Sequence, residues 1–274
     1  MRENIELRAQ LGQMQGQVNE MVSYKSLPEK MMHDNFANGV WIKQKIDVLE
    51  ALTGIEAKNV YYAYRKAANG ERVGEPEFKF KENSGFCERQ FLRGSCKRFR
   101  LECESTQRFG DKEHCMWCNK ECKCTYYCLN RPEMECYYTE DGSDRLLGKV
   151  FDPFVCFKFG YQIVADDESE SIDYTIIAKC CQWYFWMRCP CDDCQIVNFD
   201  ICEGEDQAKV VGQLSKHGRG CVANTVASGQ ADVFKVDFPQ GANWRQRAML
   251  MNAAVFIDFS LFEEKPNKKN QQSS

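Results

Sequence analysis

Cysteine is the residue type whose number and spacing in this chain could support chemistry. The 274 residues include 17 cysteines, and many of them gather in two short groups. The first group comprises Cys115, Cys118, Cys122, Cys124 and Cys128, and the second comprises Cys180, Cys181, Cys189, Cys191 and Cys194. We expect the first group to lie on a loop between strands. Thiols clustered in this way could bind a metal, carry acyl chains or fill a core.

Zinc ligation is one use of such a pattern. A structural zinc site has four thiolate or imidazole ligands in tetrahedral geometry, commonly as two pairs whose members are separated by two to four residues. Cys115 with Cys118, and Cys191 with Cys194, would supply two such pairs. The cysteines outnumber what one site needs, however, and the rest of their spacing is irregular.

Acylation and simple burial are the two alternatives to zinc. The N-terminus, MRENIELRAQ, lacks the basic start and apolar stretch of a secretory signal, so we expect synthesis in the cytosol, where thiols stay reduced. Reduced, exposed cysteines beside hydrophobic residues can acquire fatty acyl chains that hold a domain at a membrane. Outside the two groups, we expect cysteines such as Cys103, Cys156 and Cys202 to be small core residues in strands.

No other residues form a recognisable catalytic pattern. The histidines His33, His114 and His217 sit in no triad or metal-hydrolase motif, and the chain has no Walker or dinucleotide-binding glycine motif. Lys216 lies beside His217 in a short basic turn that we expect at the solvent-exposed surface. The net charge of −4 argues against a general nucleic-acid binder, because neutralising phosphates needs a basic face. We therefore expect neither an enzyme of covalent chemistry nor a nucleic-acid partner.

Two helical patterns precede the cysteines. Apolar residues recur every three or four positions at Leu7, Leu11, Met14, Val18 and Met21, which is typical of an amphipathic helix that docks on the domain, self-associates or lies on a membrane surface. A second pattern, after Pro28, ends at Gly54 and places on one face Trp41, Ile42, Ile46, Leu49 and Leu52. We predict a helix for each.

From Val60 onward the period of the apolar residues changes to two, which is typical of strands. Polar, turn-forming segments such as 69–72, 140–144, 166–171 and 203–206 separate the apolar runs. The predicted strands contain Val60, Tyr62 and Tyr64; Phe78 and Phe80; Phe99, Leu101 and Cys103; and runs within 147–164, 174–178, 196–201, 210–214 and 233–238. Many short strands at regular spacing predict a β-sandwich or a barrel.

The last apolar run, Ala248 to Phe262, is hydrophobic on nearly every side, although it contains Asn252 and Asp258. A bilayer-spanning helix needs roughly 20 predominantly apolar residues, and shorter stretches are more often buried core helices. A helix that is hydrophobic all round fits inside a barrel. We therefore predict a core helix that carries Ala248, Asn252, Phe256, Asp258 and Phe262, with membrane insertion as the alternative.

Several segments resemble the phospholipid scramblase family, over about residues 39–264. They are VLEALTGIEAKNVY (48–61), EMEC (133–136) after a cysteine-rich stretch, VVGQLSKH (210–217) and the ungapped block 231–264. Within that block, the Phe238 and Pro239 pair and the FIDF segment (256–259) fall at the family spacing. The middle of the chain, 85–205, aligns only loosely.

The resemblance implies a tubby-like fold, which is a closed antiparallel β-barrel around one hydrophobic C-terminal helix. It also implies calcium-stimulated, ATP-independent and bidirectional movement of phospholipids between the leaflets of the plasma membrane. The resemblance also implies palmitoylation of the cysteine-rich segment. By resemblance, the palmitoylation candidates are Cys118, Cys122, Cys124 and Cys128.

The family's calcium segment corresponds to residues 230–241 of this chain. The candidate ligands there are Gln230, Asp232 and Asp237. Calcium takes six to eight oxygen ligands, so two carboxylates and one amide on a segment that alternates like a strand make a poor preformed site. The alternative is that both aspartates are solvent-facing strand residues.

The expected molecule is a mainly β, membrane-associated protein. An N-terminal amphipathic helical segment covers residues 1–38, the barrel domain covers 39–264 and includes the apolar helix 244–264, and a polar tail covers 265–274. We expect it to scramble phospholipids at the cytoplasmic face of the plasma membrane and to form homo-oligomers through the N-terminal helix. Residues 212–220 correspond to the family's nuclear-import segment, which implies a secondary nuclear pool. The alternatives are a lipid-anchored module that binds lipids or proteins without moving them, and a zinc-stabilised regulatory domain.

Overall fold

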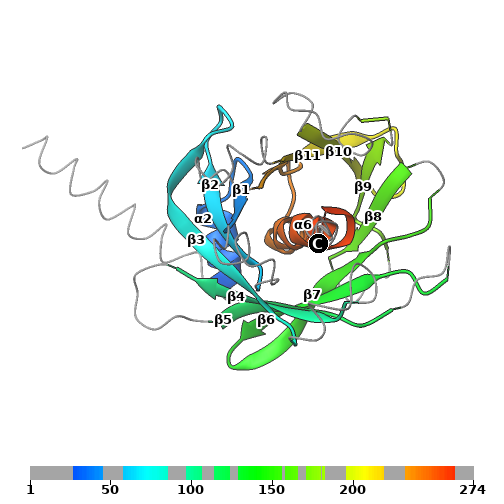
Figure 1. Ribbon diagram of the computed structural model, residues 1–274. Helices are drawn as coiled ribbons and strands as arrows, with labels where there is room; N and C mark the ends of the chain where they lie inside the picture. Colours follow the sequence, from blue (N-terminus) through cyan, green and yellow to red (C-terminus); the bar gives the residue numbers. More distant parts are fainter. Residues whose placement is uncertain are drawn as a thin grey trace, which may run out of the picture.

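The computed structural model shows a closed barrel of twelve antiparallel strands with one helix in its middle (Figure 1). It describes residues 27–45, 58–85, 97–106, 114–123, 129–155, 158–165, 171–179, 181–182, 196–218 and 232–262. Strands that follow one another in the chain are neighbours in the sheet from β2 round to β12, and β1 closes the barrel between β2 and β12.

The strands are β1 (Val40–Gln44), β2 (Val60–Lys66), β3 (Arg72–Asn83), β4 (Phe99–Ser105), β5 (His114–Lys120), β6 (Glu133–Glu140), β7 (Ser143–Phe151), β8 (Lys158–Val164), β9 (Tyr174–Lys179), β10 (Ile196–Glu203), β11 (Val210–His217) and β12 (Val233–Asp237). The described helical segments are α2 (Leu27–Asp34), α6 (Trp244–Ile257) and η4 (Asp258–Phe262), a π-helical turn that continues α6. This arrangement confirms the predicted fold class.

Alternation of side chains between two faces accounts for the strands. In β2, Tyr61 and Ala63 are buried inside the barrel, whereas Tyr62 and Tyr64 face outward and are only half-buried. Successive side chains of a strand point to opposite faces, so a sequence period of two produces one core face and one outer face. The strands predicted at β2, β3, β4 and from β7 to β12 are confirmed.

Two sequence predictions about secondary structure are wrong. Trp41 and Ile42 lie in β1 and not in a helix, with Ile42 buried inside and Trp41 half-buried on the outer face. The short run fits a helical and a strand period equally well, and pairing with both β2 and β12 decides for the strand. Cys115 and Cys118 lie in β5 and not on a loop, because cysteine is small and apolar enough to face the core.

The apolar run near the C-terminus forms α6, which lies in the middle of the barrel as predicted (Figure 1). A capping box starts the helix: the side chain of Asn243 accepts a hydrogen bond from the Gln246 backbone at 2.9 Å, and the Gln246 side chain accepts one from the Asn243 backbone at 3.0 Å. Every residue from Ala248 to Ile257 is buried. A helix with no polar face is stable here because the barrel wall covers it on every side.

The helix α2 also belongs to the packed core. Met31 and Met32 are buried, as is Phe36 just after the helix, and Phe36 stacks on Phe78 of β3 with ring centroids 5.7 Å apart. Arg247 of α6 donates to the backbone carbonyl of Met32 at 3.4 Å. Residues before β1 therefore contribute side chains to the same core as the barrel strands.

Gly39 allows β1 to approach β12 closely. Its φ is +107°, and a Cβ there would lie 2.1 Å from the carbonyl oxygen of Val236. We expect Gly39→Ala to lower the free energy of unfolding by about 1–3 kcal/mol or more, because the clash adds to the backbone strain. Gly160→Ala is the control, since a Cβ there meets nothing closer than Val155 Cγ2 at 3.4 Å. Equal midpoints of chemical unfolding for the two variants would contradict this prediction.

Candidate functional site

Three lysines are buried inside the barrel near the C-terminal end of α6. Lys97 and Lys120 are each 1% exposed and Lys216 is 0% exposed. Lys97 Nζ lies 5.4 Å from the ring centroid of Phe259, and Lys216 Nζ lies 3.9 Å from that of Phe262. Lysines are almost never fully buried unless they are paired, so partners of opposite charge have to lie close to them. The carbonyl end of a helix also favours cations.

Lys216 forms a charged network with the end of the central helix. Its Nζ lies 2.8 Å from Asp258 Oδ1 and 3.0 Å from Asp232 Oδ2. The hydroxyl of Tyr61 donates to Asp258 Oδ2 at 2.7 Å. Both carboxylate oxygens of Asp258 are therefore occupied, which fixes the end of the helix to β2 and β11.

Lys97 forms a second buried network on the neighbouring strands. Its Nζ lies 3.1 Å from Glu82 Oε1, and Ser84 donates to the same oxygen at 2.5 Å. Glu82 Oε2 accepts hydrogen bonds from the backbone and side chain of Asn59 at 3.1 and 2.8 Å. Lys120 Nζ donates to the Lys97 carbonyl at 2.7 Å. This end of the barrel is thus polar and contains buried ion pairs, in contrast to the apolar middle.

The burial of these lysines was not predicted from the sequence. Lys216 was expected at the surface, but it faces inward from β11, as Leu214 does. The signal was its phase, since residues two apart on a strand share a face. Burial of Lys216 removes this cation of the segment 212–220 from the surface, and Arg219 of the same segment lies outside the described residues.

Asn252 is the polar residue in the middle of α6. It is 0% exposed, and its amide nitrogen donates to the Ala248 carbonyl at 3.0 Å. Among the described residues, its side-chain oxygen has no hydrogen-bond partner. A buried acceptor left without a partner costs about 1–3 kcal/mol. Asn252 therefore lowers the stability of the folded domain.

The two aspartates of the expected calcium segment lie at opposite ends of β12. Asp232 pairs with Lys216 and is 9% exposed, which does not fit a solvent-facing position, whereas Asp237 pairs with Lys66 and its side chain is 50% exposed. They are five positions apart along the strand, which corresponds to roughly 16 Å. Calcium ligands lie about 2.3–2.6 Å from the ion, so these two carboxylates cannot share one ion. Gln230 lies outside the described residues.

The described cysteines are mostly buried. Cys115 and Cys118 are 2% and 1% exposed, whereas Cys122, just after β5, is exposed. The other candidates for acylation or zinc, Cys124, Cys128, Cys191 and Cys194, lie outside the described residues. Among the described residues, no group of three or more His, Cys, Asp or Glu side chains is placed to hold a metal ion.

The buried thiols pair across strands. Cys115 Sγ lies 3.9 Å from Cys103 Sγ, and Cys118 is the register partner of Cys136. Burial raises the pKa of the Cys103 and Cys136 thiols well above the ordinary value, so both stay protonated and unreactive. Cys103 and Cys202 are thus core residues, as predicted, and Cys156 lies outside the described residues.

The difference in burial between Cys122 and Cys118 predicts that a thiol reagent labels them at different rates. We expect iodoacetamide to modify Cys122 of the folded protein at least about tenfold faster than Cys118, because only an accessible thiol reacts. Peptide mass spectrometry after timed quenching measures both rates in one sample. The rates should converge in denaturant, and equal rates in the folded protein would contradict the placement of Cys118 inside the barrel.

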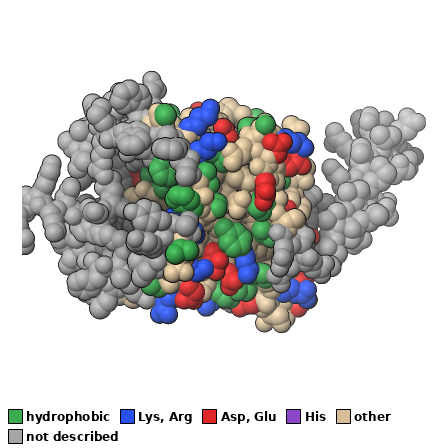
Figure 2. Space-filling model, turned by 90° about the vertical axis from the view of Figure 1, so that its right-hand side faces the viewer, with side chains coloured by type: hydrophobic (Ala, Val, Ile, Leu, Met, Phe, Trp, Pro, Cys, Tyr) green, Lys and Arg blue, Asp and Glu red, His purple; other side chains and the backbone are tan. Residues whose placement is uncertain are grey.

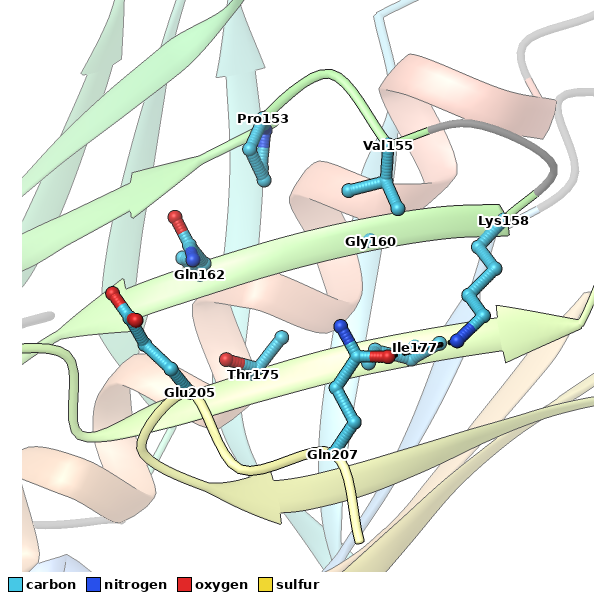
Figure 3. A pocket seen from close by; sticks show the side chains of 9 residues that line it. All are labelled: Pro153, Val155, Lys158, Gly160, Gln162, Thr175, Ile177, Glu205 and Gln207. Carbon is cyan, nitrogen blue, oxygen red and sulfur yellow. Dashed lines mark hydrogen bonds between the residues drawn. The ribbon is translucent and has the colours of Figure 1, made fainter.

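Two hollows lie around β8, where acidic, basic and apolar side chains intermingle on the outer wall (Figure 2). One, of about 350 Å³, reaches the end of the central helix and is lined by Phe154, Tyr161 and Leu261 among others. The other, of about 200 Å³, is more polar, and Figure 3 shows Lys158 and Gln207 meeting across it with a hydrogen bond of 2.8 Å. Neither hollow contains a nucleophile paired with a base.

Within the part of the chain that the structure describes, no helix is both long enough and apolar enough to cross a membrane. The helix α6 has 14 residues.

The chain is similar to proteins of a known family. The family described as Scramblase matches residues 22–264. The chain belongs to the Scramblase family. Within this family, the chain is 25% identical over 235 residues to phospholipid scramblase 1 of Mus musculus, a match that covers 85% of the chain and 63% of the mouse protein. The resemblance seen in the sequence is thereby confirmed.

Two human scramblase-family proteins show the same relationship. The chain is 26% identical over 232 residues to human phospholipid scramblase 2, which covers 82% of the chain and 67% of that protein. A shorter stretch of 73 residues is 34% identical to human phospholipid scramblase 1 and covers 27% of the chain and 22% of that protein. No solved structure matches the chain.

Proposed function

We propose that this chain moves phospholipids between the leaflets of a membrane, in both directions and without ATP. Its membership of the Scramblase family carries the proposal, because the alignments with phospholipid scramblases cover over four fifths of the chain. Such movement follows the lipid gradient and needs no covalent chemistry. The chain is on this proposal a lipid translocator and not an enzyme of covalent chemistry.

The physical task is to lower the cost of taking a polar headgroup through hydrocarbon, which is several kcal/mol for each unsatisfied polar group. The buried stretch of α6, Ala248 to Ile257, contains one polar side chain, Asn252, and it occupies the barrel interior. We therefore place lipid movement outside the barrel, in a bilayer thinned by the attached domain or between associated copies. The predicted contact between copies, Leu7 to Met21, lies outside the described residues.

Attachment to the cytoplasmic face of the plasma membrane is proposed to use palmitate on the cysteines after β5. Cys122 is exposed, in contrast to Cys118, so we assign acylation to Cys122, Cys124 and Cys128. We expect the triple Cys→Ser variant at these positions to move from the membrane fraction to the soluble fraction. Cys118→Ala is the matched control and should stay in the membrane fraction. Unchanged membrane association of the triple variant would overturn this assignment.

Liposomes test translocation directly. The purified full chain is reconstituted in vesicles that carry a fluorescent phospholipid in both leaflets, and dithionite is added to destroy the label of the outer leaflet. Scrambling brings inner label outward, so we expect the signal to fall below the level reached in protein-free vesicles. Parallel samples with and without calcium test calcium stimulation. A signal that stops at the protein-free level in both samples would overturn the proposed function.

A lipid-binding module that does not move lipids is the second candidate. The observation that favours it is the filled barrel interior, which the buried helix α6 occupies and where Lys216 pairs with Asp258 at the end of the helix. Vesicle binding without any change in dithionite accessibility would support this candidate.

A further inference from the structure

One wall of the barrel combines aromatic and basic side chains on its outer face. The wall consists of β12, β1, β2 and β3, which are consecutive neighbours in the barrel, and Figure 1 shows β1, β2 and β3 at the left. The register places Trp41 between Lys235 and Tyr64, and places Tyr62 between Lys43 and Lys79. We call these residues the aromatic-basic face: Trp41, Lys43, Tyr62, Tyr64, Lys79 and Lys235.

The aromatic rings of this face are held in place by their neighbours. Trp41 and Tyr64 pack edge to face with ring centroids 5.9 Å apart, and the Arg72 guanidinium lies 4.7 Å from the centroid of Tyr64. Lys79 Nζ lies 5.8 Å from the centroid of Tyr62. Tryptophan and tyrosine are enriched where a protein meets the headgroup region, because their rings are amphipathic.

Positive charge accumulates on the same face. Among the described residues, neither Lys43 nor Lys235 forms an ion pair. Burial and then the charge of Lys235 lower the pKa of Lys66 and of His217, so cations crowd around Lys235. The acidic groups near the face are already engaged or outweighed. Asp237 pairs with Lys66, and Glu104 pairs with Lys81. Glu75 raises the pKa of Tyr64 by less than Arg72 lowers it.

The other walls do not share this charge pattern. On the outer faces of β4 to β7 and just after β5, basic side chains pair with acidic ones, as in Lys149 with Glu135 at 3.0 Å and Lys123 with Glu133 at 2.7 Å. The wall around β8 and β9 likewise mixes acidic and basic side chains (Figure 2). The chain as a whole is acidic, with a net charge of −4. Among the described residues, Lys43 and Lys235 therefore combine the absence of an ion pair with neighbouring outward-facing aromatic rings.

We infer that the aromatic-basic face is the surface on which the barrel rests against an anionic phospholipid bilayer. Its lysines attract anionic headgroups and its rings enter the interfacial layer. The inference rests on the proposed membrane function, but binding through this face does not require lipid movement. In this orientation of the barrel, the strands of this wall lie along the surface of the bilayer.

Vesicle sedimentation of the purified, non-acylated full chain tests the inference. The vesicles contain phosphatidylcholine alone, or phosphatidylcholine and phosphatidylserine at about 7:3. We expect the chain to partition onto the anionic vesicles, and Lys43→Gln/Lys235→Gln to lower the partition coefficient about 25-fold, at about fivefold for each charge near the surface. Trp41→Ala should also weaken binding, and this loss should persist at high salt because burial of a ring is not screened.

The control variant Lys158→Gln/Lys179→Gln removes the same charge from the opposite wall and should bind within about twofold of the unaltered chain. Circular dichroism establishes that each variant is folded. Equal binding by the two double variants, or no preference of the unaltered chain for anionic vesicles, would overturn the inference. If the unaltered chain scrambles lipids but the two double variants bind equally, the inference is overturned and the proposed function stands. If only Lys43→Gln/Lys235→Gln loses binding and the unaltered chain does not scramble lipids, the inference stands and the proposed function is overturned.

Discussion

Lys216→Met is expected to lower the free energy of unfolding by about 3–5 kcal/mol, since it leaves two buried carboxylates without their shared cation. Asp258 and Asp232 lie 2.8 and 3.0 Å from the ammonium, and Lys216 itself is 0% exposed. The midpoint of chemical unfolding, at an unchanged slope, measures the loss.

Two controls separate the charge effect from packing. The triple variant Lys216→Met/Asp232→Asn/Asp258→Asn removes the stranded charges, so it should be more stable than Lys216→Met alone. Lys149→Met breaks the partly exposed pair with Glu135 and should cost less than about 1 kcal/mol. A triple variant that is no more stable than the single one would show that the lysine acts through its volume and not through its charge.

Phe256→Ala is expected to cost about 3–5 kcal/mol, because it opens a cavity in the middle of the domain. Phe256 is 0% exposed and packs edge to face on Tyr161 of β8, with ring centroids 5.8 Å apart. The helix cannot shift to fill the space, since its capping box holds one end and Asp258 holds the other.

The matched control for the cavity is Val210→Ala. Val210 is 53% exposed at the start of β11, so its truncation should change the free energy of unfolding by no more than about 0.5 kcal/mol. Chemical unfolding of both variants under the same conditions makes the comparison. A small effect of Phe256→Ala would mean that α6 does not pack against the wall as tightly as the structure shows.

The sequence alone was sufficient for the family, the barrel and its central helix. Alternation at Tyr61 to Tyr64 and continuous hydrophobicity from Ala248 to Ile257 are local patterns, and burial follows directly from them. Local patterns failed where one short run satisfied two periods. Trp41 and Ile42 illustrate this, because pairing with β2 and β12, and not propensity, makes β1 a strand.

Only the closed barrel decided where the charged groups lie. Lys216 places an ammonium group in the core. It is tolerated there because Asp258, 42 residues away in the chain, and Asp232 contact it inside the barrel. Tyr61 completes the same network from 197 residues before Asp258. Cys118 is similarly hidden by its place in β5. Burial of a polar side chain depends on partners that chain closure brings together, whereas burial of an apolar run depends on its own composition.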